Sequence, residues 1–261
     1  MVLISMKAKK SLGQNFLIDN NIINKISKSI LATKNDLIIE IGPGMGALTK
    51  KLKEKNTIII CYEIDTDLKP YLNTLEDSKT RIIYQDILSS NISYDIKDIK
   101  YNNLYIVGNL PYYITTPIIK YLINLDLDIK EMIFMVQEEV ADRFSAMPNT
   151  KEYGAITLYL KYYYNVTKLF KVSKKCFNPM PKVESAIIKF TKRVDKPLID
   201  ENKYFKLIND IFKQKRKTLK NNLSNYDFNK VKKVLDKYNL KDTVRAEEIS
   251  EEIFIEILNN L

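Results

Sequence analysis

The chain has 261 residues, a formal net charge of +10 and no histidine. This length allows one large domain with a small one, or two modest domains, and 45% hydrophobic residues support a real core. The positive charge suits a polyanionic partner such as nucleic acid, although a general bias toward lysine explains it equally well. The absence of histidine excludes nucleophiles activated by histidine and histidine metal ligands.

Cysteine usage and the lack of long apolar runs indicate a cytoplasmic protein. Cys61 and Cys176 are far apart and match no metal-ligand spacing, which fits a reducing compartment. Residues 1–7 are too short and wrongly ordered for a signal peptide. No apolar run approaches the roughly 20 residues that span a bilayer, so we expect no membrane association.

The hydrophobic patterns predict alternating strands and helices up to about residue 192, after a basic arm at Lys7–Ser11. The predicted strands are Leu37–Ile41, Thr57–Tyr62, Arg81–Tyr84, Leu104–Gly108, Glu131–Val136, Val166–Val172 and Ser185–Phe190. Helices are predicted from Asp19 or Asn20 to Ile30, at Ala47–Lys53, from Thr115 or Thr116, and at Gln137–Met147 and Ala155–Tyr164. This alternation is typical of a doubly wound α/β sheet.

A linker at Thr191–Glu201 precedes a part of the chain that has helical patterns only. The predicted helices are about Glu201–Leu223, Asp227–Tyr238 and Ala246–Leu258. The first carries a basic run, Lys213, Lys215, Arg216, Lys217 and Lys220. That run could line a phosphate backbone, and a solvated helix face explains it nearly as well.

The segment Asn109-Leu-Pro-Tyr112 follows the predicted fourth strand, and ligands of open α/β sheets bind just past such strand ends. Pro111 pushes Leu110 into an extended conformation, which aims the Leu110 carbonyl outward. The side-chain oxygen of Asn109 is a second acceptor close by. Two acceptors beside an aromatic ring can hold a planar base by its exocyclic amine. On these four residues alone, a plain strand-end turn is the simpler interpretation.

Glycines and acidic residues end three earlier strands. The turn Gly42-Pro-Gly-Met-Gly46 lets backbone approach a ligand where a helix begins, but its spacing is not that of the dinucleotide fingerprint. Glu40 before it disfavours a pyrophosphate and suits a cationic or amine-bearing ligand. Glu63 ends the second strand, where a carboxylate suits ribose hydroxyls, and Asp86 follows the third. Each could be an ordinary loop residue, but two beside a glycine turn favour ligand contacts.

With these residues in view, the chain resembles the S-adenosylmethionine-dependent rRNA adenine N6-dimethyltransferases over nearly its whole length. The segments that carry the resemblance are Gly13–Leu17, Glu40–Gly46, Asn109–Tyr112 and Phe177–Ser185. The presence of all four segments in this order is specific for the family, whereas any one of them could occur by chance. The resemblance implies a Rossmann-like class I methyltransferase sheet over residues 1–192. It also implies a small all-helical C-terminal domain over residues 200–261 that recognises RNA.

The resemblance implies S-adenosylmethionine as the methyl donor and no metal. The cofactor contacts that it implies are Asn15, Leu17, Gly42, Glu63, Asp86 and Asn109. In this interpretation Glu63 takes the ribose hydroxyls and Asp86 the adenine amine of the cofactor. The Gly42 turn packs against the methionine part, and residues 14–17 close over the cofactor.

The catalytic residues implied by the resemblance are Asn109, Leu110, Pro111, Tyr112 and Phe177. Asn109 Oδ1 and the Leu110 carbonyl each accept one hydrogen of the target adenine N6, so that its lone pair faces the methyl group. Tyr112 stacks on one face of the base. Phe177, predicted to be exposed on a stiff proline-bounded loop, covers the other face; the alternative is that this loop is a plain connector.

Two branches of the family compete. One dimethylates two adjacent adenines near the 3′ end of 16S rRNA within an immature small subunit, and the Erm resistance branch methylates 23S rRNA. Ser11–Asp19, Asn109–Pro117 and Gln137–Gly154 resemble the bacterial small-subunit branch more closely, although Tyr113 stands where many members carry Asn. We therefore expect a monomeric 16S rRNA enzyme. An Erm-type enzyme and a mainly RNA-binding ribosome assembly factor are the alternatives.

Overall fold

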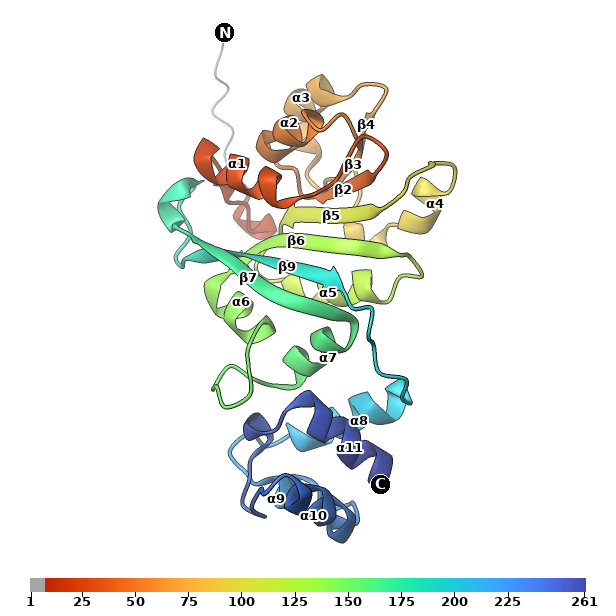
Figure 1. The fold of residues 1–261 in the computed structure, drawn as a ribbon. Coiled ribbons are helices and arrows are strands. Elements are labelled where there is room, and N and C mark those ends of the chain that lie inside the picture. Colours follow the sequence, from red (N-terminus) through yellow and green to blue (C-terminus); the bar gives the residue numbers. More distant parts are fainter. Residues whose placement is uncertain (1–7) are drawn as a thin grey trace. The chain divides into compact units, whose positions relative to one another are not determined.

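The computed structural model describes residues 8–261 (Figure 1). These residues group into two compact units. The first comprises the chain up to Ala141 together with Thr167–Lys192, and the second comprises Asp142–Val166 and Arg193–Leu261. The predictions for residues 1–7, which are the exclusion of a signal peptide and the first residue of the basic arm, lie outside the described residues.

Most predicted elements are confirmed, with ends that differ by at most three residues. The strands are β1 Phe16–Leu17, β2 Leu37–Ile41, β3 Ile58–Tyr62, β4 Thr80–Ile83, β5 Leu104–Asn109, β6 Ile129–Gln137, β7 Tyr164–Val172, β8 Phe177–Asn178 and β9 Ser185–Lys192. The helices are α1 Asn20–Ser29, α2 Ala47–Lys53, α3 Lys69–Leu72, α4 Ile92–Ile96, α5 Thr115–Ile123, α6 Glu138–Phe144, α7 Ala155–Tyr163, α8 Glu201–Ile211, α9 Leu219–Asn222, α10 Phe228–Lys237 and α11 Glu251–Asn260.

Seven strands form one sheet in the order β4-β3-β2-β5-β6-β9-β7. The strands from β4 to β6 run parallel, and β9 is antiparallel to β6. The register pairs Ile41, the last residue of β2, with both Tyr62 and Gly108. Because the carboxyl ends of β2, β3 and β5 are level, the residues that follow them meet at one edge of the sheet.

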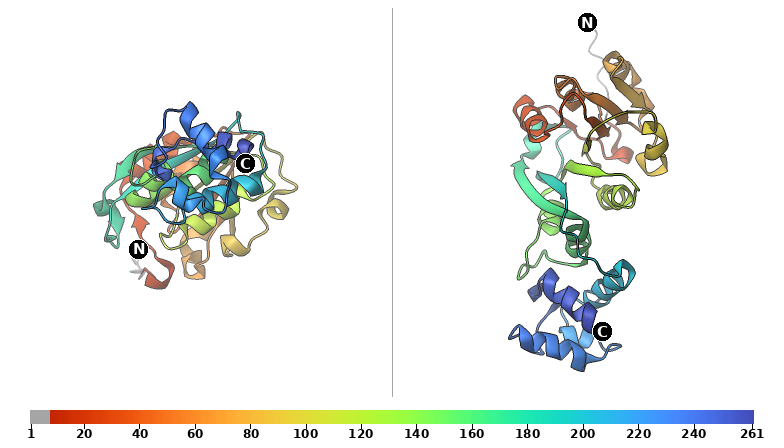
Figure 2. Two further views of the ribbon diagram at one scale, coloured as in Figure 1. Left: turned by 90° about the horizontal axis from the view of Figure 1, so that it is seen from below. Right: turned by 45° about the vertical axis from the view of Figure 1, so that its right-hand side comes forward.

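Both faces of the sheet are covered, as the continuous apolar strands predict. All five residues of β2 are buried. Residues of α1, α2 and α3 share a core cluster with alternate residues of β2, β3 and β5, such as Ile38, Ile59 and Val107. In the right-hand view of Figure 2, α1 (red) and α5 (yellow-green) lie on opposite sides of the sheet.

A second, two-stranded sheet joins the N-terminal segment to the end of the first unit. In it β1 is antiparallel to β8, with Phe16 opposite Asn178 and Leu17 opposite Phe177. Of the two residues predicted to begin α1, Asp19 is the N-cap, since its side chain accepts hydrogen bonds from two backbone N–H groups of the first turn.

The prediction of one helix over residues 201–223 is wrong. In the structure α8 ends at Ile211 and α9 begins at Leu219. Four cations at positions 213–217 crowd like charge into little more than one turn, which opposes a helix there. Thr218 then caps α9 by accepting from the Asn221 N–H, and the Leu219 N–H donates to the Val244 carbonyl at 2.8 Å.

The prediction of a helix over Ala246–Leu258 is correct only in part. Ala246–Glu248 is a short 3-10 turn, Ile249 is extended, and α11 begins at Glu251 after Ser250. The Glu248 side chain accepts from the Arg245 N–H at 2.6 Å, which closes the first turn on itself. The second unit has its own core, to which α7, α8, α10 and α11 all contribute.

Candidate functional site

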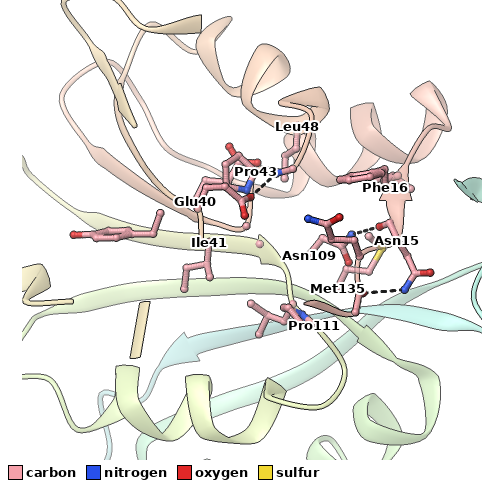
Figure 3. A pocket seen from close by; sticks show the side chains of 18 of the residues that line it. Asn15, Phe16, Glu40, Ile41, Pro43, Leu48, Asn109, Pro111 and Met135 are labelled. Carbon is pink, nitrogen blue, oxygen red and sulfur yellow. Dashed lines mark hydrogen bonds between the residues drawn. The ribbon is translucent and has the colours of Figure 1, made fainter. Parts of the chain in front are cut away.

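A cavity of about 520 Å³ opens at the carboxyl ends of β2, β3 and β5 (Figure 3). Its walls include ten of the predicted site residues, and Phe177 is the exception. The predicted residues on the wall are Asn15, Leu17, Gly42, Glu63, Asp86, Asn109, Leu110, Pro111 and Tyr112, together with Glu40. Residues predicted from five separate segments therefore share one cavity.

The glycine turn between β2 and α2 has the backbone conformation that only glycine adopts readily. Gly42, Gly44 and Gly46 have φ angles of 67°, 58° and 77°. A Cβ on Gly44 would lie 3.1 Å from the Phe16 ring, so the missing side chain lets the N-terminal segment close on the turn. This arrangement leaves backbone, rather than side chains, facing the cavity on this side.

Glu63 and Asp86 follow β3 and β4 and have their carboxylates held by backbone N–H groups. The two oxygens of Glu63 accept from Gly44 at 3.1 Å and from Asp65 at 2.9 Å. Burial raises the pKa of Glu63, whereas these N–H donors favour its ionised form. Asp86 accepts from the Leu88 N–H at 3.0 Å and caps a 3-10 turn. Both carboxyl groups are thereby fixed in direction at the cavity wall.

Glu40 lies beneath the glycine turn and is only 2% exposed. Its Oε2 accepts from the Thr49 hydroxyl at 2.7 Å, and the Cys61 thiol lies 3.7 Å away. Burial raises the pKa of Glu40 to about 7. The carboxyl group is thus bound to α2 and can be neutral near physiological pH.

Asn109 is the last residue of β5, and its side chain is anchored by the N-terminal segment. Its Nδ2 donates to the Asn15 carbonyl at 2.9 Å, the contact drawn in Figure 3. The amide is thereby oriented so that Oδ1 is the atom left for a ligand. The Leu110 N–H donates to the Met135 carbonyl at 3.2 Å, which fixes the backbone that carries the second predicted acceptor.

Tyr112 is half-buried, and its hydroxyl lies 2.7 Å from the Ser185 Oγ, where either group can donate. Ser185 is the first residue of β9 and is fully buried. Burial raises the pKa of the Tyr112 phenol, so its hydroxyl stays protonated and can donate or accept in this contact. Ser185 lies in the segment Phe177–Ser185 that carries the family resemblance, but no role was predicted for it. The structure shows that it holds the Tyr112 ring.

The prediction that Phe177 is exposed is wrong. Its side chain is 3% exposed and belongs to the core cluster of the first unit. The neighbouring prolines indicated a surface loop, but Phe177 lies in β8 and pairs with Leu17 of β1. Its pairing partner is remote in the sequence, so no local pattern could indicate this burial.

The N-terminal segment is also tied to the residues after β3, a contact that the sequence analysis missed. Asp65 accepts from Lys9 Nζ at 2.5 Å and from Gln14 Nε2 at 2.6 Å. The Lys9 N–H donates to Gln14 Oε1 at 2.7 Å, and Lys9 also pairs with Asp67 at 2.6 Å. These contacts raise the pKa of Lys9 and lower that of Asp65. They hold residues 9–14 beside the cavity.

The basic run of the second unit is exposed. Its five cations, Lys213, Lys215, Arg216, Lys217 and Lys220, lie on the connection between α8 and α9 and at the start of α9. Among residues 8–261, no helix is long and apolar enough to cross a membrane. The same residues contain no group of three or more Cys, Asp or Glu side chains that could hold a metal ion. A metal-free reaction stays a prediction.

Comparisons with solved structures agree with this fold. A dimethyladenosine transferase from Plasmodium falciparum superposes with a TM-score of 0.79 at 24% identity, covering 93% of this chain and 95% of that chain. The 23S rRNA methyltransferase ErmE gives a TM-score of 0.74 at 23% identity, covering 95% and 99%. This chain therefore shares their fold, a seven-stranded methyltransferase-like sheet followed by C-terminal helices.

Sequence comparisons identify the family. The family model described as ribosomal RNA adenine dimethylase matches residues 5–261, and the chain belongs to this family. A protein of Streptococcus sanguinis named ribosomal RNA small subunit methyltransferase A is 42% identical over 94% of this chain and 89% of its own length. Its namesake from Oceanobacillus iheyensis is 39% identical over 96% and 89%. The resemblance derived from the four segments is confirmed.

Proposed function

We propose that this protein uses S-adenosylmethionine to dimethylate the N6 atoms of two adjacent adenines near the 3′ end of 16S rRNA in immature small subunits. The observation that carries the proposal is the anchored amide of Asn109, whose Nδ2 is bound to the Asn15 carbonyl at the wall of the cavity. The names of relatives about 40% identical support the small-subunit substrate over the 23S rRNA alternative. The net charge of +10 suits an RNA partner.

The described residues fit S-adenosylmethionine. The cavity of about 520 Å³ has the size of a small-molecule site, and a carboxylate and bare backbone face it. Glu63 would hold the ribose hydroxyls, Asp86 the adenine amine, and the turn at Gly42 the methionine part. Asn15 and Leu17 would close the site from the N-terminal side. When bound, the sulfonium supplies an electrophilic methyl group, so the protein need not activate it.

The protein's own task is to prepare the nucleophile. The lone pair of adenine N6 is delocalised into the ring, and acceptors on both N6 hydrogens favour a pyramidal nitrogen. Asn109 Oδ1 and the Leu110 carbonyl are the proposed acceptors, and both are fixed before substrate binds. Fixed dipoles and positioning then lower the barrier. The nitrogen loses a proton only after it gains the methyl group, when it is acidic enough for water to accept that proton.

Tyr112 is the proposed stacking surface for the flipped adenine, and its hydrogen bond to Ser185 sets the ring plane. The proposed role of Phe177 on the other face requires that it leave the core, which would open the pairing with Leu17. In the structure Phe177 is a core residue that pairs with Leu17 of the cavity wall, and stacking by its ring stays a prediction.

We also propose that the sheet domain over residues 1–192 carries catalysis and that residues 200–261 recognise RNA. The compact second unit combines the C-terminal helices with Asp142–Val166, so α7 belongs with them in packing. Exposed cations at positions 213–220 support RNA contact by this part. A monomeric state and a cytoplasmic location stay predictions.

Methyl transfer from labelled S-adenosylmethionine tests the proposal. The substrates are immature small subunits that lack the modification and protein-free 23S rRNA. We expect dimethyladenine at two adjacent positions of 16S rRNA and none in 23S rRNA. Label in 23S rRNA would instead identify an Erm-type enzyme. Binding of subunits without transfer, in a protein that binds the cofactor, would leave the assembly-factor alternative.

A further inference from the structure

Tyr113 is exposed at the mouth of the cavity although its neighbour Tyr112 is held inside. The Tyr113 side chain is 61% exposed, yet it belongs to the cavity wall. Tyr112 is half-buried and bound to Ser185. The two consecutive aromatic rings therefore lie in different places: the Tyr112 ring lines the interior of the cavity, and the Tyr113 ring lies at its rim.

The Tyr113 ring packs against the backbone of Gly13. Gly13 has a φ of 62°, and a Cβ at this position would be 3.3 Å from Cε1 and 3.4 Å from Cδ1 of Tyr113. The absence of a side chain thus lets the ring lie against the backbone of the N-terminal segment. That segment is itself fixed, because the Asn15 carbonyl accepts from Asn109. One side of the ring is supported and the rest faces solvent.

The Tyr113 ring combines exposure with a place on the cavity wall, so it offers a flat face to a ligand that extends beyond the cavity. Ile18, also on the cavity wall, is 57% exposed and adds apolar surface. Such a rim suits the flat face of a nucleobase, which has π-electrons whatever its sequence identity. A lipid or peptide partner would not explain why this ring adjoins the proposed catalytic segment.

We propose that Tyr113 forms a second stacking subsite, which takes the nucleobase next to the adenine in the cavity. This inference rests on the proposed function and deepens it. Flipping one base out exposes the face of its neighbour to water, and the Tyr113 ring covers that face. Rings on consecutive residues, one inside and one on the rim, suit consecutive bases of one strand. Stacking also tolerates the change of neighbour when the second adenine enters the cavity.

The test compares Tyr113→Ala and Tyr113→Phe with Tyr94→Ala as the matched control. Tyr94 lies in α4, is also 61% exposed, and is not on the cavity wall. With immature small subunits as substrate, Tyr113→Ala should raise the KM for RNA roughly tenfold, the scale of one stacked base. The kcat and the KM for S-adenosylmethionine should stay unchanged. Tyr113→Phe and Tyr94→Ala should behave as the wild type.

A fluorescence experiment reports stacking directly. Subunits carry 2-aminopurine at the position beside the target adenine, and stacking on Tyr113 quenches its emission. The wild type and Tyr113→Phe should quench it, whereas Tyr113→Ala should not. Equal quenching and equal KM values in an active Tyr113→Ala protein would overturn the subsite alone. A wild-type protein that methylates no small-subunit adenine would instead overturn the proposed function on which it rests.

Discussion

The hydrogen bond between Tyr112 and Ser185 predicts unequal losses of stability when either partner is changed. Ser185 is 0% exposed, so Tyr112→Phe leaves a buried hydroxyl without a partner, which costs about 1–3 kcal/mol. Ser185→Ala instead leaves the phenol hydroxyl of Tyr112 without this partner, and because Tyr112 is only half-buried we expect a cost of about 0.5–1.5 kcal/mol. We therefore expect Tyr112→Phe to lower the free energy of unfolding more than Ser185→Ala does.

Activity should respond differently, because catalysis depends on the ring and its orientation. Tyr112→Phe and Ser185→Ala keep the ring, but each removes the hydrogen bond that orients it. Both should therefore lower kcat/KM, and to a similar extent. Tyr112→Ala removes stacking worth roughly 1–3 kcal/mol, or roughly 5- to 150-fold in kcat/KM, while the affinity for S-adenosylmethionine survives.

Urea unfolding followed by circular dichroism measures stability, and single-turnover methyl transfer measures activity. The double variant completes a double-mutant cycle. Its loss of unfolding free energy should be smaller than the sum of the losses in Tyr112→Phe and Ser185→Ala, since the same hydrogen bond is lost in both. Exactly additive losses would refute a coupling between the two hydroxyls. Wild-type turnover in Tyr112→Ala would refute the stacking role, whatever the stability data show.

Three further predictions address the glycine turn and the acidic residues beside it. Burial raises the pKa of Glu40 from 4.5 to about 7, so its contribution to stability is fully present below pH 4.5 and is lost as the pH rises through about 7. In the wild type, this effect should lower the free energy of unfolding by about 3 kcal/mol between about pH 5 and about pH 8, as measured by urea unfolding. Glu40→Gln, which cannot ionise, should not show this pH-dependent decrease. Glu63→Ala should weaken S-adenosylmethionine binding in calorimetry, whereas Glu54→Ala, at an exposed end of α2, should not; equal affinities would remove Glu63 from the site. Gly46→Ala should lower the melting temperature markedly, because its Cβ would lie 2.3 Å from Leu75 Cδ1 at a φ of 77°, and an unchanged value would contradict this packing.

Local sequence patterns correctly predicted those elements whose structure depends on residues close together in the sequence. The strand Leu37–Ile41 and the helix Ala47–Lys53 have the predicted ends, because an apolar run and closely spaced glycines specify strand, turn and helix within a short segment. The level strand ends then brought Glu63 and Asp86 to the cavity that also contains Asn109. That convergence follows from parallel topology, which the alternation of elements predicted.

Contacts between distant segments account for what was missed. Lys9 and Asp65 are 56 positions apart, and no periodicity relates them. Phe177 was predicted to be exposed because prolines surround it, but its pairing with Leu17 buries it. The break in the helix after Ile211 depends partly on the hydrogen bond from the Leu219 N–H to the Val244 carbonyl, which is also remote in sequence.

The pairing of β1 with β8 has a consequence for how the protein is made. A ribosome synthesises Phe16 and Leu17 early, but their partners Phe177 and Asn178 emerge only after all of β2–β7. Native pairing of such distant segments is slow, because the intervening chain must first be brought together. The nascent β1 segment therefore waits unpaired until β8 has been synthesised. The proposed cofactor site gains the wall that β1 forms only at that point, and we expect no native cofactor binding before then.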